Sequence, residues 1–266
     1  MMAARTLRST SRRHLPWNYT MQRYFTSKKC ALIVGAGDST GAAIARAFAV
    51  DGFLVCCVRR DGVKVQELVE SIRKAGHDAE GFGVDCRDES NVQNLVEDIE
   101  RRLGPIDVAV FNVGANVRFS ITDTTARVYR KVWEMACFSG FLMGKEVASR
   151  MLPRGRGTIL FTGATASVRG SAGFAAFASA KFGLRALSQS MARELGPRGL
   201  HVAHLIVDGA IDTPWIHENF PEAKAKLVQQ GLVRPQDIAA LYVQVHHQPK
   251  TAWTHELDVR PWVETW

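Results

Sequence analysis

The chain alternates short apolar runs with longer amphipathic stretches from residue 30 onward. The apolar runs have the length of buried strands, and they cover residues 31–34, 53–58, 79–84, 108–111, 158–161, 201–207 and 254–259. Helices are expected over residues 63–74, 89–103, 126–151 and 174–195, and another carries Ala42, Ile44 and Phe48 on one side. This alternation predicts an α/β fold: a single Rossmann-type, doubly wound parallel sheet of about seven strands, with helices on both faces.

Ligands of such sheets bind at the carboxyl ends of the strands, where the winding of the chain reverses. In this sequence those positions are residues 35–41, 59–60, 85–86, 112–114, 162–165 and 208–213. Residues 214–233 are expected to form a lid. The lid mixes apolar and charged side chains, which permits a partly apolar ligand.

A glycine-rich turn follows the first expected strand. Gly35, Gly37 and Gly41 form the pattern GxGxxxG, and glycine permits a sharp reversal from strand into helix. The turn leaves free N–H groups and the positive end of the helix dipole at the helix N-terminus, so a phosphate fits there. Glycines after a strand also occur in ordinary tight turns, but the strand–turn–helix context favours a nucleotide site.

The positive charge of the chain is concentrated at its N-terminus. Of 34 Lys+Arg against 26 Asp+Glu in 266 residues, seven cations and no acid lie in residues 1–29. The remainder is near neutral, so the basic balance gives no support for nucleic-acid binding. Residues 1–28 have the composition of an organellar transit peptide, and Arg23-Tyr24-Phe25 resembles a mitochondrial processing site. We expect a basic targeting leader and a mitochondrial protein; the alternative is a retained, disordered tail on a cytoplasmic one.

Residues 29–266 are expected to form one domain. No apolar run approaches the roughly 18 residues that a membrane span requires, so we expect no membrane partner. The cysteines form no CxxC pair and no ligand spacing with histidine, which predicts reduced thiols and no metal site. These cysteines are Cys30, Cys56, Cys57, Cys86 and Cys137.

Two arginines, Arg59 and Arg60, follow the second expected strand. An NAD-preferring site has an acid at this place for the ribose 2′-hydroxyl, whereas arginine pairs with a 2′-phosphate. Inside a dinucleotide fold the pair therefore favours NADP(H) over NAD(H). The alternative is a solvated pair of surface arginines.

From about residue 29 to the end, the chain resembles the short-chain dehydrogenase/reductase family. The glycine turn resembles the phosphate loop of that family, although the middle glycine falls on Ser39. Phe111-Asn112-Val113-Gly114 resembles the family's NNAG turn, and Ile211-Asp212-Thr213 resembles the loop after the sixth strand. The resemblance implies a cofactor site made of Gly35, Gly37, Ser39, Thr40, Gly41, Arg59, Arg60, Asp85, Cys86, Asn112, Gly114, Lys181, Ile211 and Thr213.

At the positions that match the family's proton-transfer residues, this chain lacks most of them. Its YxxxK motif appears as FxxxK, with Phe177 in place of the tyrosine and Lys181 retained. The usual serine falls on Ala164, and the usual asparagine of the long central helix falls on Cys137. Phenylalanine and alanine have no hydroxyl to pass or hold a proton, and such general acid catalysis is typically worth about 10²–10⁴ in rate.

Other groups near these positions could take over the lost roles. Thr165 is either a substrate anchor or a plain loop residue. Asp208, directly after the sixth strand, is either an acid near the nicotinamide or the cap of a turn. Cys137 fits a small buried hydrophobe better than a nucleophile. Lys181 can still hold the ribose of a cofactor even without turnover.

The sequence therefore predicts an NADP(H)-dependent oxidoreductase that acts on a small-molecule carbonyl or alcohol with altered catalytic residues. The alternative is a non-catalytic NADP(H)-binding scaffold or sensor. The resemblance also implies a homodimer or homotetramer formed through the two long helices. The aromatic tail, residues 255–266, suggests packing against a neighbouring subunit.

Overall fold

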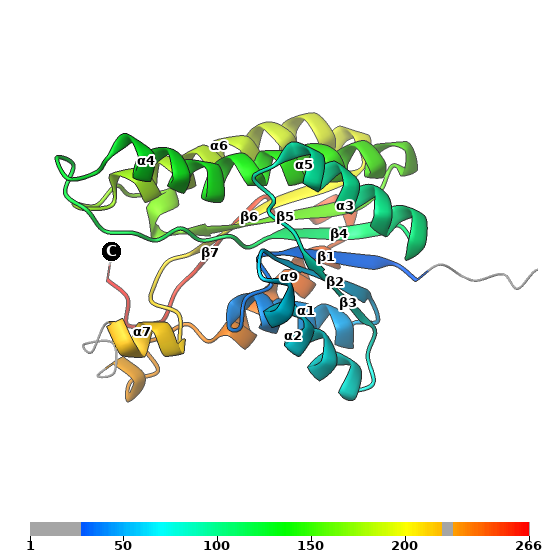
Figure 1. Ribbon diagram of the computed structural model, residues 1–266, viewed down its shortest axis with the longest axis horizontal. Coiled ribbons are helices and arrows are strands. Elements are labelled where there is room, and N and C mark those ends of the chain that lie inside the picture. The colour runs from blue at the N-terminus through cyan, green and yellow to red at the C-terminus, as the bar shows by residue number, and fades with distance from the viewer. Residues whose placement is uncertain (1–27, 220–225, 266) are drawn as a thin grey trace, which may run out of the picture.

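A parallel sheet lies at the centre of the structure, a computed structural model that describes residues 28–219 and 226–265. Its seven strands follow the order β3-β2-β1-β4-β5-β6-β7, and every strand pair is parallel. Figure 1 shows helices on both faces of the sheet, with α4, α5 and α6 on one side and α1, α2 and α9 on the other. The predicted α/β architecture is confirmed.

The elements alternate along the chain as the hydrophobic pattern predicts. The strands are β1 (Cys30–Val34), β2 (Leu54–Arg59), β3 (Ala79–Gly83), β4 (Ile106–Phe111), β5 (Gly157–Ala164), β6 (Leu200–Val207) and β7 (Glu256–Val259). The helices are α1 (Thr40–Val50), α2 (Gly62–Lys74), α3 (Glu89–Arg102), α4 (Ala126–Trp133), α5 (Ser139–Met151), α6 (Ala175–Leu195), α7 (Pro214–Asn219) and α9 (Pro235–His246). None of the described helices is both long and apolar enough to cross a membrane.

The sheet has a separate apolar core on each face, because successive side chains of a strand point to opposite faces. On one face, Ala31 and Ile33 of β1 belong to a cluster with α1, α2 and α9. On the other face, Leu32 and Val34 belong to a cluster with α3, α5 and α6. Burial on both faces explains why β1 is a continuous apolar run rather than an alternating one.

The winding of the chain reverses between β1 and β4. From β1 the sheet grows through β2 to β3 in one direction, and from β4 it grows through β5, β6 and β7 in the other. A crevice therefore opens at the carboxyl ends of these two central strands. Gly35 and Asn112 are the first residues after them.

The helical stretch predicted over residues 126–151 is present, but it is not α-helical throughout. α4 ends at Trp133, residues 134–138 form a π-helical turn, and α5 begins at Ser139. A π turn shifts which side chains of the following helix face the sheet, and such turns often lie at functional sites. The predicted helical stretch is therefore confirmed, and the π turn inside it is a feature that hydrophobic periodicity does not register.

The fifth strand is also longer than predicted, because it continues to Ala164. Its pairing with β6 runs from Gly157↔Leu200 to Ala164↔Val207. Thr162 and Ala164 therefore belong to the strand rather than to the loop after it. Their positions are fixed by a sheet ladder up to the edge of the crevice.

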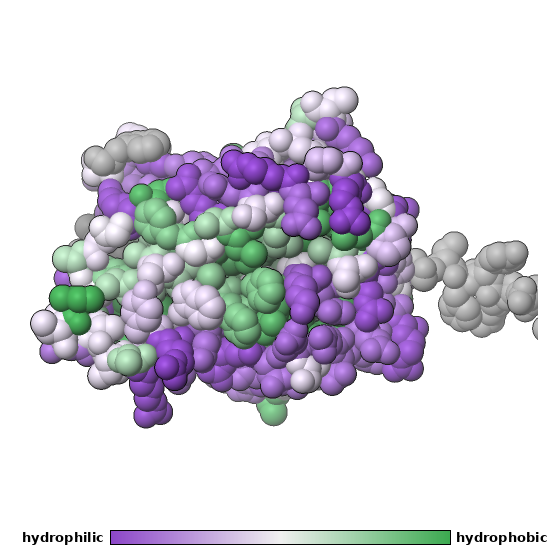
Figure 2. Space-filling view, turned by 90° about the horizontal axis from the view of Figure 1, so that it is seen from above, coloured by the Kyte–Doolittle hydropathy of each residue, from purple (hydrophilic) through white to green (hydrophobic). Residues whose placement is uncertain are grey.

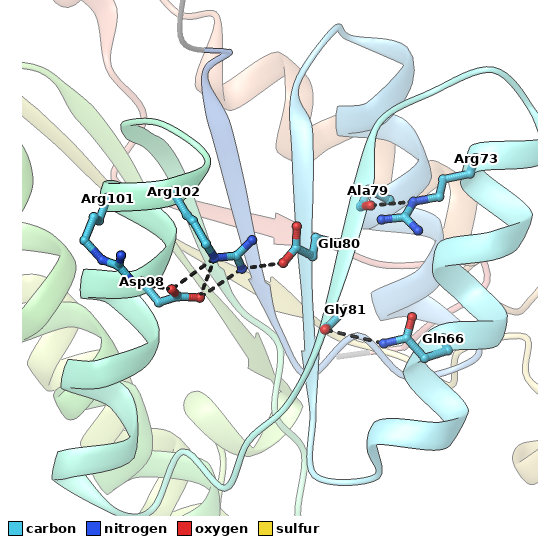
Figure 3. A network of polar contacts seen from close by, with 8 residues as sticks. All are labelled: Gln66, Arg73, Ala79, Glu80, Gly81, Asp98, Arg101 and Arg102. Carbon is cyan, nitrogen blue, oxygen red and sulfur yellow. Dashed lines mark hydrogen bonds and ion pairs between the residues drawn. The ribbon is translucent and has the colours of Figure 1, made fainter.

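The outer strand β3 is tied to the helices on either side of it (Figure 3). Arg73 of α2 donates a hydrogen bond of 2.9 Å to the backbone carbonyl of Ala79. Arg102 of α3 pairs with Glu80 of the strand. These contacts anchor an edge strand, which has a sheet partner on only one side.

Candidate active site

The glycine turn between β1 and α1 is closely packed on one side and open on the other. A Cβ on Gly35, whose φ is +89°, would lie 2.4 Å from the carbonyl oxygen of Asn112. A Cβ on Gly41 would lie 2.2 Å from the carbonyl oxygen of Gly35. A Cβ on Gly37 would meet nothing within 4 Å. The turn therefore requires glycine for its packing at two positions and leaves room for a ligand at the third.

The N-terminus of α1 meets this open side. Ser39 precedes the helix and makes no side-chain cap to it within the described part of the chain, and Thr40 is buried in the first turn. The first N–H groups of a helix have no intrahelical acceptor. Together with the helix dipole they suit a phosphate, as the sequence predicts.

The end of β2 carries a charge pair that the sequence does not reveal. The guanidinium of Arg59 donates a hydrogen bond of 2.7 Å to the carboxylate of Asp38. Asp38 comes from the glycine turn and its side chain is 76% exposed, whereas that of Arg59 is 19% exposed. Arg60 is exposed. A 2′-phosphate at this place would compete with the Asp38 carboxylate for Arg59.

Asp85 and Cys86 follow β3. The side chain of Arg87 donates hydrogen bonds to both carboxylate oxygens of Asp85, and these bonds hold the pKa of Asp85 below its usual range. Cys86 is buried, and burial raises the pKa of its thiol to about 12. Asp85 is thus an ionised hydrogen-bond acceptor at neutral pH, while Cys86 is an unreactive part of the wall.

The residues at these strand ends enclose a cleft of about 210 Å³. From the predicted cofactor set it gathers Gly35, Gly37, Arg59, Arg60, Asp85, Cys86, Asn112 and Gly114. The cleft has open space beside two of its glycines, since a Cβ on Gly37 or on Gly114 would meet nothing within 4 Å.

Asn112 links the two central strands to the core. Its side-chain amide donates to the carbonyl oxygen of Gly35 at 3.2 Å, and its side-chain oxygen accepts from the hydroxyl of Thr162 at 3.1 Å. The same Thr162 hydroxyl lies 2.5 Å from the buried hydroxyl of Tyr242 on α9. This chain of hydrogen bonds connects the glycine turn and the crevice wall to α9. The sequence pattern indicates Asn112 but gives no sign of Tyr242.

A second cavity, of about 540 Å³, adjoins the cleft. The two share Asn112, Val113 and Gly114 as a common wall. Besides this common wall, the second cavity is lined by apolar side chains of α6 and α7 and by six more of the predicted site residues, namely Ala164, Thr165, Phe177, Lys181, Ile211 and Thr213. Cys137 and Asp208 do not line it.

Lys181 of α6 also lines this cavity. Its side chain is buried, and its ammonium group donates to the carbonyl oxygens of Val113 at 3.1 Å and Thr162 at 2.8 Å. Burial lowers the pKa of Lys181 to about 8. An ammonium group has three N–H donors, so one remains for a ligand in the cavity that Lys181 lines.

Phe177 lies one helical turn before Lys181 and offers no polar atom. The centre of its ring is 5.8 Å from the Lys181 ammonium nitrogen.

Cys137, in the π-helical turn, packs against α6, where a Cβ on Gly183 would lie 2.9 Å from its sulfur. Burial raises the pKa of the Cys137 thiol. The contacts of Cys137 are those of a small apolar side chain.

Thr165 follows the lost serine position and takes part in a polar network. Its hydroxyl donates a hydrogen bond of 2.5 Å to a carboxylate oxygen of Asp208. The other oxygen of Asp208 lies 3.3 Å from the guanidinium of Arg260, and both side chains are largely buried. Asp208 therefore orients Thr165 and faces a cation, and among the described residues no backbone N–H donates to its carboxylate as a turn cap requires. The sequence suggests both Thr165 and Asp208, but Arg260 is brought in only by the fold.

A further polar network lies behind Ala164 and was not predicted. The N–H of Ala164 donates to the hydroxyl of Ser167 at 3.1 Å, which lies 3.4 Å from a ring nitrogen of His204. The other ring nitrogen is 3.6 Å from Glu256, which also pairs with Arg185. Burial lowers the pKa of His204 to about 4, so its ring is neutral at pH 7. This network fixes the backbone that carries Thr165.

The lid and the tail meet at the rim of the cavity. Ile211 forms a parallel bridge with Val233. A Cβ on Gly209 would lie 2.7 Å from the ring of Pro261, so the tail packs in part on its own chain rather than only outward. The side chain of Trp262 is 79% exposed. Residues 220–225 of the predicted lid and residues 1–27 of the predicted leader lie outside the described residues.

No disulfide forms among the cysteines: all five are free and buried. Within the described ranges there is no group of three or more His, Cys, Asp or Glu side chains that could hold a metal ion.

Comparisons with known proteins agree with this geometry. The family model for short chain dehydrogenase matches residues 29–224. A short-chain dehydrogenase/reductase of Hericium erinaceus is 33% identical over 226 residues, covering 81% of this chain and 89% of the relative. The 7alpha-hydroxysteroid dehydrogenase of Escherichia coli K12 is 30% identical over 216 residues, covering 79% and 84%.

Solved structures show the same similarity. A short-chain dehydrogenase from Rhodopseudomonas palustris is 47% identical with a TM-score of 0.75, covering 88% of this chain and 99% of that one. A 7 alpha-hydroxysteroid dehydrogenase complexed with NADH and 7-oxo glycochenodeoxycholic acid is 28% identical with a TM-score of 0.80, covering 87% and 92%. A metagenomic short-chain oxidoreductase in complex with NADP shares the fold at 24% identity, with a TM-score of 0.76 and coverage of 88% and 97%. This chain belongs to the short-chain dehydrogenase family, whose fold binds a nicotinamide cofactor and carries oxidoreductase activity.

Proposed function

We propose that the protein is an NADP(H)-dependent oxidoreductase of small-molecule carbonyls or alcohols in which Thr165 and Asp208 replace the family's usual hydroxyl pair. The observation that carries this proposal is the wall of Asn112, Val113 and Gly114 that the nucleotide cleft and the second cavity share. A cofactor in the cleft and a substrate in the cavity would meet there.

The preference for NADP(H) rests on charge. Arg59 and Arg60 line the cleft, and a guanidinium pairs well with a phosphate. The carboxylate of Asp38 already pairs with Arg59, which weakens the preference. We therefore expect NADPH to bind more tightly than NADH by a moderate factor, with Arg60 adding a second positive charge.

Thr165, which lines the cavity, and Asp208, which accepts a hydrogen bond from it, supply the proton chemistry. A bound nicotinamide cofactor would supply the hydride chemistry, at an alcohol carbon in one direction and at a carbonyl carbon in the other. In the oxidation direction the proton of the substrate hydroxyl passes to the Thr165 oxygen as the Thr165 proton passes to Asp208, and the alcohol becomes a carbonyl. Reduction is the reverse. The distance of 2.5 Å between Thr165 and Asp208 is short enough for this transfer.

Lys181 has an orienting role in this proposal. Its ammonium group is held by two backbone carbonyls, so its position in the cavity wall is fixed and one N–H remains to donate. Such a donor suits the ribose hydroxyls of a cofactor or the oxygen of the substrate.

Calorimetry with NADPH and NADH on the full chain tests the first half of the proposal. A panel of aldehydes, ketones and alcohols, followed by NADPH absorbance, tests the second half. Thr165→Val and Asp208→Asn should each lower kcat by about 10²-fold or more, because each removes one member of the proton path. Ser171→Ala is the matched control, since Ser171 lines the same cavity and has no part in the path.

Equal rates for the parent chain, Thr165→Val and Asp208→Asn would contradict this mechanism. Tight NADPH binding without turnover on any carbonyl or alcohol would favour the second candidate function, a non-catalytic NADP(H) sensor or scaffold. The observation in favour of that candidate is that Phe177 and Ala164 bring neither donor nor acceptor to the cavity that they line.

We also propose that the protein forms a homodimer or homotetramer through the face of α4, α5 and α6. Figure 2 looks down on this face and shows apolar side chains gathered in a band across it. Tyr129, Trp133, Phe141 and Phe182 are each about two-fifths exposed on these helices. An exposed aromatic patch of this kind marks a protein interface. Sedimentation of the parent chain and of Phe182→Glu tests it, and a monomeric parent would refute it.

Residues 1–28 are proposed to direct the chain to mitochondria, on the basis of their Arg-, Ser- and Thr-rich, acid-free composition. A fluorescent fusion of the full chain should co-localise with mitochondria, and removal of these residues should abolish this. Unchanged distribution after their removal would contradict the proposal.

A further inference from the structure

Three cations and no carboxylate line the second cavity among the residues that the structure describes. The cations are Arg169, Lys181 and Lys226. Lys181 is buried, whereas Arg169 and Lys226 are exposed and belong to the loop before α6 and to the lid. A substrate in this cavity therefore meets positive charge at more than one place.

Arg169 differs from the other two cations in its surroundings. Its backbone N–H donates to the carbonyl of Thr165 at 3.0 Å, which ties the residue to the loop that carries the proposed proton path. Its side chain is exposed, and within the described ranges no carboxylate forms an ion pair with it. Lys226 differs, because its ammonium group lies 3.3 Å from the carboxylate of Glu264.

The remaining wall of the cavity is mostly apolar. Phe174, Phe177, Trp215 and Ile216 line it. The guanidinium of Arg118 lies 5.9 Å from the centre of the Phe174 ring, so further positive charge lies beside this wall. An apolar wall with a cation at its rim fits a ligand that is apolar along its body and negative at one end.

We propose that the substrate is an apolar carbonyl or alcohol compound that carries a carboxylate, and that Arg169 binds this carboxylate. This inference rests on the proposed function, because it names the class of substrate for the same cavity. A guanidinium can hold both oxygens of a carboxylate in a planar, bidentate pair. The carboxylate would then fix the register of the substrate, with its carbonyl deeper in the cavity near Thr165.

A matched pair of ligands tests the proposal without turnover. The probes are 4-benzoylbutyrate, an aryl ketone with a flexible carboxylate, and its methyl ester, which has the same carbonyl and no charge. Calorimetry on the full chain, with and without NADPH, should give about tenfold tighter binding of the acid than of the ester. The difference should shrink with added salt, because it is electrostatic.

Arg169→Gln should remove this preference and leave the affinity for the ester unchanged. Arg193→Gln is the matched control, since Arg193 is an exposed arginine of α6 that does not line the cavity, and it should keep the full preference. Equal binding of acid and ester by the parent chain would overturn the proposal, and so would failure of both to bind. A preference that survives Arg169→Gln would refute the role of Arg169.

The proposed function fails in a different way. It is contradicted when NADPH does not bind or when no carbonyl is reduced, both of which are measured without reference to the acid. Selective binding of 4-benzoylbutyrate by a chain that does not turn over would support the anion site and contradict the oxidoreductase.

Discussion

Returning the two missing hydroxyls should restore the family's ordinary proton transfer. The double variant Phe177→Tyr with Ala164→Ser places a phenol and an alcohol at two positions that line the second cavity. Both additions are small, and each side chain lies at the cavity wall rather than wholly inside the core. We therefore expect the variant to fold and to bind NADPH like the parent.

The expected increase in rate follows from the position of Lys181. The centre of the Phe177 ring is 5.8 Å from the Lys181 ammonium nitrogen. At an effective dielectric constant near 20, a unit charge at this distance stabilises a phenolate by about 3 kcal/mol. That attraction lowers the pKa of the introduced phenol toward the working pH, where general acid catalysis contributes about 10²–10⁴ in rate. We expect kcat for ketone reduction to rise by about that factor.

The assay follows NADPH oxidation with a panel of ketones for the parent, the double variant and two controls. Phe182→Tyr makes the same chemical change on the exposed side of α6 and should have no effect. Adding Lys181→Met to the double variant should remove most of the gain, because the buried charge that activates the phenol is lost.

A double variant that binds NADPH with unchanged affinity but reduces no ketone faster than the parent would refute this reasoning. It would mean that the cavity does not bring a carbonyl next to the nicotinamide. A gain that survives Lys181→Met would instead refute the electrostatic role of Lys181.

Three other predictions concern the cofactor cleft and stability. Asp38→Asn should tighten NADPH binding by up to about fivefold and leave the affinity for NADH unchanged, because it frees Arg59 from an exposed ion pair. Calorimetry measures both affinities, and a parallel change in the affinity for NADH would contradict this prediction. Gly41→Ala should lower the free energy of unfolding by about 1–3 kcal/mol and abolish NADPH binding, since its Cβ would lie 2.2 Å from a backbone oxygen. The Cβ of Gly37→Ala meets no protein atom within 4 Å, so this variant should weaken NADPH binding without loss of stability. Urea unfolding and calorimetry separate the two effects, and equal losses of stability would contradict this prediction. Burial lowers the pKa of His204 from 6.5 to about 4, so its neutral form stabilises the fold above pH 6.5. This contribution, up to about 3 kcal/mol, is lost as pH falls toward 4. The melting temperature of His204→Gln should therefore depend less on pH in this range than that of the parent, and an unchanged dependence would contradict the prediction.

Much of the fold was predictable because each strand and helix is specified by local periodicity. A parallel strand buried on both faces needs a continuous apolar run, as in β1, and a helix needs an apolar stripe, as in α3. Two local features were not predictable. The π-helical turn of residues 134–138 and the extension of β5 to Ala164 depend on packing against the sheet, and neither changes the hydrophobic pattern.

The candidate site was predictable only in part, for a similar reason. Glycine in a sharp turn and the FxxxK spacing are local properties, so Gly35, Phe177 and Lys181 could be singled out from the sequence. The partners of these residues come from distant segments. No sequence spacing indicates that Asp38 pairs with Arg59, or that Arg260 from the tail faces Asp208.

The sequence by itself determined the sheet, the glycine turn and the absence of the usual hydroxyls, because each depends on residue type and near neighbours along the chain. The tertiary structure alone decided which charges meet, which polar groups are buried together, and where the cavity opens. Those outcomes depend on contacts between residues tens to hundreds of positions apart, such as Asn112 with Thr162 and Thr165 with Asp208. Such contacts exist only once the strands lie in register.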